Sequence, residues 1–170
     1  ADASSGLAEQ VVAALAEVPN AAAVAPIMSI AGSVQAEGNT PTNASVIATT
    51  PDFISITNFP IRDGQFIDNT TNIDTAVVGS QLSVDLFGTD QSIGKIFKVR
   101  GKTFTVIGVL KPLNRPINYN NVDFDHTAII SMESGKQFNQ NVAQIQQIDI
   151  KASSTDKLAS VVGDVKKVLN

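Results

Sequence analysis

The chain has 170 residues, of which 43% are hydrophobic and 16% charged, a composition typical of a folded globular protein rather than a disordered one. Its formal net charge is −4 and its Lys and Arg residues form no cluster, which disfavours a nucleic-acid-binding surface. The absence of cysteine excludes disulfides, thiolate nucleophiles and thiolate metal sites. The longest apolar runs, VVAALA and AAAVAPIM, are far shorter than the about 20 residues that a membrane-spanning helix needs. Because the start ADASSG and the end KKVLN look like chosen boundaries, we expect a fragment of a longer protein.

The first predicted elements are a helix and two strands. Apolar residues at helical spacing predict a helix from Ser4 or Ser5 to about Val18, and Pro19 ends it. Between residues 24 and 36 the apolar positions alternate instead, which predicts a half-buried strand with Met28, Ile30, Val34 and Ala36 on one face. After the turn cluster EGNTPTN, residues 44–49 form a second strand that could pair back on the first.

The next part of the chain is less regular. Residues 50–67 (TPDFISITNFPIRDGQFI) are interrupted by two prolines and a glycine, so we expect a long, partly ordered connection there. Residues 75–79 predict a short apolar strand. Ser80 is placed to cap a following helix that ends at Gly88.

The stretch FGTDQSIGKI (residues 87–96) contains a Gly-Lys pair, which is also a feature of phosphate-binding loops. Such a loop needs G-x-x-x-x-G-K followed by Ser or Thr, and it leads from a strand into a helix. Here five residues separate Gly88 from Gly94, and Ile96 stands where the hydroxyl would be. The residues after Lys95 have a strand pattern, so the sequence does not support a nucleotide site.

Instead, the region predicts a β-hairpin. A two-residue type II′ turn at Gly101-Lys102 would place Phe97 opposite Val106 and Val99 opposite Phe104, with all four side chains on one face.

Pro112 and Pro116 end this hairpin, residues 116–126 (PINYNNVDFDH) predict a polar loop, and residues 127–132 (TAIISM) another short strand. A last strand carries Ile148, Ile150 and Ala152 on one face, and a final helix begins at Ser153 or Ser154. The sequence shows no internal repeat. Strands between two terminal amphipathic helices predict an α+β fold with a mixed or antiparallel sheet.

The segment AVVGSQLSVDLFGTDQSIGKIFKVRGKTFTVIGVL (residues 76–110) resembles the extracytoplasmic core domain of MacB-like ABC transporter permeases. It contains, in the family's order, a valine-rich strand, a short helix ending in Leu-Phe-Gly, an Ile-Gly-Lys, a hairpin and a Val-Ile-Gly-Val strand. Upstream, VPNAAAVAPIMS is similar to the stretch that follows the family's first helix, and the resemblance covers nearly the whole chain. Two departures are Gln65, where the family has Arg, and Ala48, where Gly is common.

This resemblance implies a two-lobed structure, in which residues 1–74 and 143–170 form a porter-like α/β lobe and residues 75–142 an inserted, small β-rich lobe. It also implies a non-catalytic domain on the periplasmic or extracellular face of a bacterial membrane. Such a domain would relay ATP-driven movement to the export or extraction of a hydrophobic or amphipathic substrate, such as a drug, peptide or lipoprotein. The implied partners are the transmembrane helices of the same permease, a cytoplasmic ABC ATPase and a second copy in a homodimer. The resemblance implies no cofactor, metal or catalytic residue, and it identifies no substrate-binding residue.

The residues themselves leave some alternatives open. His126 lies in DFDH with Asp123 and Asp125, which could form a metal or acid–base site, although a solvated loop residue entering a strand is the simpler interpretation. Ser80 and His126 could belong to a hydrolase triad, but the sequence GSQL lacks the second glycine of a nucleophile elbow. The loop around Tyr119 could contact a substrate or a neighbouring subunit. A stand-alone extracellular domain that binds a peptide or glycan is the main alternative function.

Overall fold

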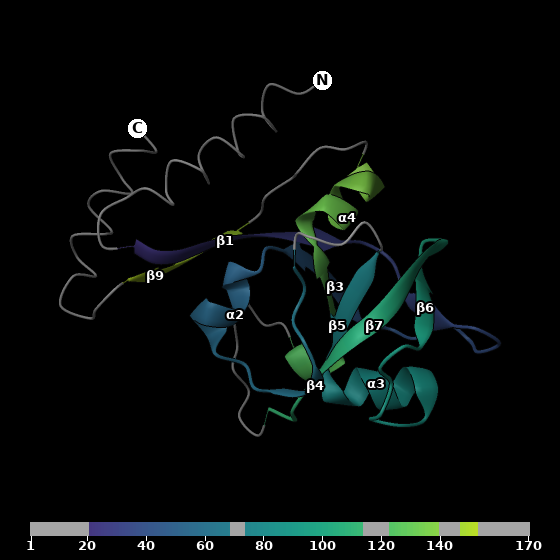
Figure 1. The fold of residues 1–170 in the computed structure, drawn as a ribbon. Helices are drawn as coiled ribbons and strands as arrows, with labels where there is room; N and C mark the ends of the chain where they lie inside the picture. The colour runs from purple at the N-terminus through teal and green to yellow at the C-terminus, as the bar shows by residue number, and fades with distance from the viewer. Residues whose placement is uncertain (1–20, 69–73, 114–122, 140–146, 153–170) are drawn as a thin grey trace.

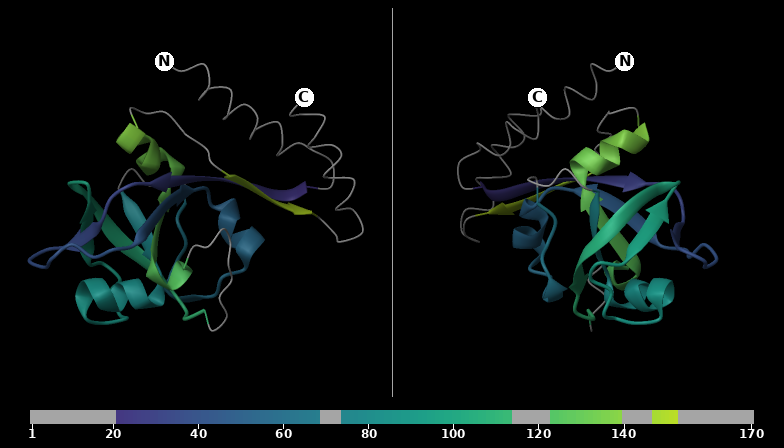
Figure 2. Two further views of the ribbon diagram at one scale, coloured as in Figure 1. Left: turned by 180° about the vertical axis from the view of Figure 1, so that it is seen from behind. Right: turned by 45° about the vertical axis from the view of Figure 1, so that its right-hand side comes forward.

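A computed structural model of the chain describes residues 21–68, 74–113, 123–139 and 147–152. Nine strands of these residues form one sheet (Figures 1 and 2). The strand order is β2 (Val34–Ala36), β6 (Ile96–Val99), β7 (Lys102–Leu110), β5 (Thr75–Val78), β8 (Thr127–Ser131), β3 (Ser45–Thr49), β1 (Ala21–Ile30) and β9 (Gln147–Ala152), and β4 (Ile61–Gly64) pairs with β7. The pairs β3–β8 and β5–β7 are parallel and the other pairs antiparallel, which confirms the predicted α+β fold with a mixed sheet.

Short helices cover the two faces of this sheet. They are α2 (Asp52–Thr57), α3 (Ser80–Phe87) and α4 (Met132–Lys136), with 3-10 turns η1 (Phe124–His126) and η2 (Gln137–Asn139). In all views α4 lies above β1 and α2 below it (Figures 1 and 2).

The alternation predicted for residues 24–36 is confirmed, but it spans two strands. Met28, Ile30, Val34 and Ala36 are all buried in the same core cluster. The chain breaks between them at Gly32, whose φ of +135° is one that L side chains rarely adopt. This break lets β1 pair with β3, as expected, while β2 crosses to β6 at the far edge of the sheet.

The hairpin is confirmed, and its turn lies one residue earlier than predicted. Val99 pairs with Lys102 and Phe97 with Phe104, so the turn residues are Arg100 and Gly101. Their φ values of +50° and +85° are those of a type I′ turn rather than type II′. When a two-residue turn moves by one position along the chain, each strand residue pairs with a residue two positions away from the predicted partner. Since side chains on one face of a strand repeat every two residues, every side chain stays on its predicted face. The rings of Phe97 and Phe104 therefore still stack on the buried side, 5.9 Å apart.

The prediction that Ser80 caps α3 is wrong. Gly79 is the N-cap residue, and no side-chain hydrogen bond caps this helix. A Cβ on Gly79 would lie 2.1 Å from the carbonyl oxygen of Phe124, so the close approach of η1 admits only glycine there. The predicted end of the helix is confirmed, because Gly88 closes it with a left-handed φ of +73°.

The partly ordered connection expected over residues 50–67 contains two regular elements that the sequence did not indicate, α2 and β4. Its aromatic residues fill a second core on the face of the sheet opposite the first, where Phe53, Phe59, Phe66 and Phe124 pack with ring centroids 4.9 to 6.1 Å apart. Burying each of these side chains stabilises the fold by about 1.5–3 kcal/mol. Tertiary burial thus adds order to a segment whose prolines and glycine predicted only partial order.

The helices predicted at the two ends of the chain, and Tyr119, lie outside the described residues. The division into two lobes stays a prediction. The first part of β1 pairs with β9, whereas β2, β3 and β4 pair with strands from residues 75–142.

Candidate functional site

The first and last described segments of the chain are joined in one antiparallel ladder. β1 pairs with β9 from Ala21 opposite Ala152 to Ile27 opposite Gln147, with one irregularity between residues 21 and 23. Partners in such a ladder have Cα atoms about 4.5–5.5 Å apart. The described chain therefore enters and leaves the fold at one place (Figure 1), and we call this ladder the β1–β9 ribbon.

Strand β1 also pairs with the rest of the sheet, on the side opposite β9. Beyond the ribbon, Met28, Ser29 and Ile30 pair with β3, and β3 pairs with β8. A strand of this length spans about 30 Å without a loop. The ribbon is therefore joined to β3, and through β3 to β8, without an intervening loop in β1.

On its lower face β1 is held by α2. Phe53 of α2 is fully buried in a cluster with Ala25, Ile27 and Ile47. Next to this contact, the buried hydroxyl of Thr49 donates a hydrogen bond to the carbonyl oxygen of Pro26, at 2.8 Å. Because this bond is buried, losing it would leave a polar group without a partner.

On its upper face β1 is held by α4. A Cβ added to Gly135 would lie 2.4 Å from the Cβ of Ala48 and 3.0 Å from the Cε of Met28. The helix therefore rests directly on β3 and β1, with no room for a methyl group between them. Ser131 begins the helix by accepting a hydrogen bond from the backbone N–H of Ser134, at 3.1 Å.

Polar contacts connect α4 and η2 to the turn of the β6–β7 hairpin. The Ser134 hydroxyl donates to Asp74 Oδ1 at 2.7 Å, and Lys102 Nζ lies 3.0 Å from the other oxygen of Asp74. Lys102 also donates to the side chain of Gln137. We call these four residues the Asp74 latch. Beside it, the Phe138 ring lies under the guanidinium of Arg100, which is 5.5 Å from the ring centroid.

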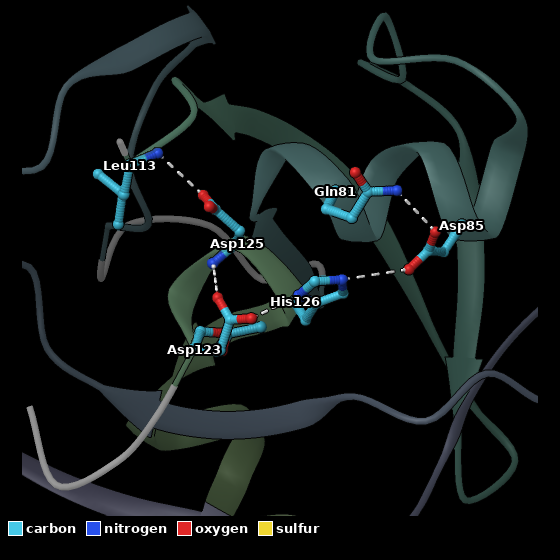
Figure 3. Close-up of polar contacts among 7 residues, drawn as sticks. Gln81, Asp85, Leu113, Asp123, Asp125 and His126 are labelled. Atoms are coloured by element: carbon cyan, nitrogen blue, oxygen red, sulfur yellow. Dashed lines mark hydrogen bonds and ion pairs between the residues drawn. The ribbon is translucent and has the colours of Figure 1, made fainter. Parts of the chain in front are cut away.

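His126 lies in a polar network between η1 and α3 (Figure 3). Its Nδ1 is 2.7 Å from Asp123 Oδ2, and its Nε2 is 3.7 Å from Asp85 Oδ2 on α3. Asp125 points the other way and accepts a hydrogen bond from the backbone N–H of Leu113, at 3.0 Å. Among the residues that the structure describes, no group of His, Asp and Glu is arranged to hold a metal ion. These contacts connect η1 to α3 and to the segment that follows β7.

The other candidate residues are not brought into a reactive arrangement. In the described part of the chain no hydrogen bond joins Ser80 to His126, whose contact on α3 is with Asp85 instead. The backbone N–H of Gly94 donates to Val106, and that of Lys95 donates to Ser92. These two amides are thus used within the hairpin region and do not surround a phosphate site.

Sequence reasoning missed the residues that hold α4. The stretch SMESGK does carry a local signal, because Ser131 is a favoured N-cap residue and Glu133 follows in the first turn, where the helix dipole favours an acid. Nothing local relates Asp74 or Lys102 to Ser134, since these residues lie in separate segments of the sequence. Within the described ranges no helix is long and apolar enough to cross a membrane.

Residues 1–168 match the family model for the MacB-like periplasmic core domain, and the chain belongs to this family. It is thus an extracytoplasmic domain of a MacB-like ABC transporter permease. In fold it is similar to the periplasmic region of MacB from Actinobacillus actinomycetemcomitans, with a TM-score of 0.77 at 15% identity over 95% of this chain and 72% of the other. The extracellular domain of the transporter YknZ from Gram-positive bacteria gives a TM-score of 0.76 at 17% identity, over 95% and 81% of the two chains.

Among curated proteins, the macrolide export ATP-binding/permease protein MacB of Syntrophobacter fumaroxidans is 29% identical over 156 residues, which are 85% of this chain and 21% of that protein. The pyoverdine export ATP-binding/permease protein PvdT of Pseudomonas aeruginosa is 32% identical over 102 residues, 58% of this chain and 15% of that protein. The chain therefore spans about a fifth or less of the length of these two relatives.

Proposed function

We propose that this domain relays movement from the membrane part of its permease to the extracytoplasmic space and performs no bond chemistry itself. The observation that carries the proposal is the β1–β9 ribbon, in which both ends of the described chain meet before β1 continues into the sheet. A transmembrane helix before residue 1 and another after residue 170 would both act on this ribbon. Their relative movement would then reach the domain at a single place.

The contacts of α4 give this movement a route across the domain. The helix rests on β1 and β3 through Gly135, and the Asp74 latch and Phe138 connect it to the β6–β7 hairpin. Packed elements of this kind move as rigid units rather than bending continuously. Because α4 is packed on β1 and connected to the hairpin, a displaced ribbon would move α4 and the hairpin together with β1.

The partners and the substrate are inferred from the relatives. The two curated relatives are named as ATP-binding/permease proteins for macrolide and pyoverdine export. By this analogy we infer that ATP binding and hydrolysis in a cytoplasmic ABC ATPase drive the movement and that the permease exports a substrate. From the family resemblance we further propose that two copies of the permease act together and that the substrate is hydrophobic or amphipathic. A stand-alone binding domain has no such support, since these relatives are permeases.

The relay is tested by breaking the Asp74 latch in the full-length transporter. Asp74→Ala removes the acceptor of both Ser134 and Lys102, so Ser134 of α4 loses its connection to Lys102 beside the hairpin turn, and the contact of Lys102 with Gln137 remains. We expect ATP hydrolysis by the reconstituted transporter to stay within about twofold, while substrate exported per ATP falls about fivefold or more, a difference of about 1 kcal/mol in coupling.

The matched control is Arg62→Ala, which removes a comparably exposed ion pair with Asp90 outside this route. Arg62 hydrogen-bonds to Asp90, and this contact raises the pKa of Arg62, so the control variant also removes a contact between opposite charges. The control variant should export normally. Unchanged export by Asp74→Ala, or an equal loss of ATPase activity and export, would contradict the relay.

A further inference from the structure

A small groove lies at the edge of the sheet that β2 and β6 form, on the side where alternate side chains of these two strands are exposed. It has a volume of about 370 Å³ and is lined by Gln35, Ala36, Glu37, Gly38, Ile96, Phe97 and Lys98. This volume is within the lower range of ligand-binding pockets. In Figure 1 the hairpin that carries β6 lies at the opposite side of the molecule from the β1–β9 ribbon. The groove is thus remote from the place where the described chain enters and leaves the fold.

The strand register sets the pattern of side chains in the groove. Gln35 is opposite Lys98, and one position beyond the end of β2 the chain places Glu37 beside Ile96. Along β6 the odd positions are buried and the even ones exposed, so Ile96 and Lys98 both face outward. Ile96 is 43% exposed, so its side chain offers an apolar surface to a ligand in the groove.

The wall of the groove is fixed before any ligand binds. Asn39 donates a side-chain hydrogen bond to the carbonyl oxygen of Leu86 on α3, at 3.1 Å, and accepts one from Gln35 at its own carbonyl, at 2.7 Å. The outer edge of β2 is closed, because Val34 exchanges two backbone hydrogen bonds with Thr42. A ligand would therefore be recognised by side chains and would not add a strand to the sheet.

The charges indicate what the groove would bind. In the described part of the chain neither Glu37 nor Lys98 has an ion-pair partner. Ile96 and Lys98 are two positions apart on one strand, so their Cα atoms are separated by about 6.7 Å. An extended peptide repeats its side chains on one face at the same spacing. One apolar and one acidic residue, two positions apart, would meet Ile96 and Lys98 together.

We propose that this groove binds an extended segment of another polypeptide in the extracytoplasmic space, with an apolar and an acidic side chain two positions apart. The apolar side chain would cover Ile96, the carboxylate would pair with Lys98, and Gln35 would hydrogen-bond the peptide backbone. Because the wall is already ordered, little conformational entropy would be lost there on binding. The inference is independent of the relay, since binding is measured without transport.

The test measures the binding of labelled synthetic peptides to the full-length permease by fluorescence anisotropy. One peptide carries valine and glutamate two positions apart in a Ser/Thr background, and the second has the same composition with the two residues adjacent. We expect the first to bind about tenfold more tightly, because only its valine and glutamate share a face. Ile96→Thr and Lys98→Glu should each weaken its binding about fivefold or more.

Two comparisons separate recognition from a general loss of structure. Val84→Thr removes an apolar side chain of similar exposure on α3, away from the groove lining, and should leave binding unchanged. Lys98→Glu should bind a peptide in which lysine replaces the glutamate, which also shows that the variant is folded. Equal binding of the two spacings, equal effects of Val84→Thr and Ile96→Thr, or no binding of the lysine peptide to Lys98→Glu would each overturn the proposal.

Discussion

The contact between α4 and the sheet makes a quantitative prediction for Gly135→Ala. The new Cβ would lie 2.4 Å from the Cβ of Ala48, where ordinary contacts begin at 3.4 Å. Helix and strand must therefore separate by about 1 Å at this point, and overpacking of this kind costs about 1–3 kcal/mol. Alanine also favours the helical backbone, by less than about 1 kcal/mol near a helix end. We expect a net loss of about 1–2 kcal/mol in the free energy of unfolding.

The reasoning is tested by a double-mutant cycle with Ala48→Gly. This second change removes the atom that the new methyl group would strike, and by itself it costs about 1 kcal/mol in a strand. In the double variant the next neighbour is the Cε of Met28, at 3.0 Å, which is the end of a flexible side chain. The double variant should therefore be more stable than the sum of the single effects by about 1 kcal/mol or more.

Urea unfolding followed by circular dichroism is the suitable assay, because the chain has no tryptophan and one tyrosine. Gly38→Ala is the matched control, since a Cβ at Gly38 meets nothing within 4 Å. Because Gly38 has a left-handed φ of +79°, the Gly38→Ala variant should also lose about 1 kcal/mol in the free energy of unfolding. This loss should show no coupling to Ala48→Gly. Additive effects of Gly135→Ala and Ala48→Gly would show that α4 is not in direct contact with the sheet.

Two further predictions concern β1. Thr49→Val removes the buried hydrogen bond to Pro26 and should lower the free energy of unfolding by about 1–3 kcal/mol, whereas Thr49→Ser keeps the hydroxyl and loses about 0.8 kcal/mol for one methyl group. A valine variant as stable as the serine variant would refute the importance of that bond. A disulfide between cysteines at positions 25 and 149, which are partners in the ribbon, should leave export by the full transporter within about twofold, because the two strands move as one body. The pair 24 and 150 is tested beside it, since close, non-hydrogen-bonded pairs alternate along a ladder. Export that stops on oxidation and returns on reduction would show that the strands must part.

Local sequence predicted several elements because their signals are short-ranged. The alternation of Met28 and Ile30, the hairpin around Gly101 and the glycine end of α3 depend on residues close together in the chain, and the structure confirms each. Even the wrong position of the hairpin turn left the buried face correct, because side chains in a strand repeat every two residues. The block of residues 76–110 was also enough to indicate the family, to which the chain belongs.

The elements that sequence reasoning missed are those ordered by distant parts of the chain. Helices as short as α2 and α4 carry no periodic signal, and in isolation they would not be stable. α2 forms because Phe53 is buried beneath β1 and β3. Ser80 looked like a cap by its local pattern, but the carbonyl of Phe124 approaches so closely that Gly79 takes that position.

The sequence by itself thus determined which residues face inward, where the main strands and the hairpin lie, and to which family the chain belongs, because these depend on periodicity and on motifs of neighbouring residues. Only the tertiary structure decided that β1 joins the ribbon to the central sheet, that Gly135 rests on Ala48, and that Asp74 connects Ser134 to Lys102. These contacts join residues far apart in the chain, and their geometry is set by how the whole core packs, which no local pattern records.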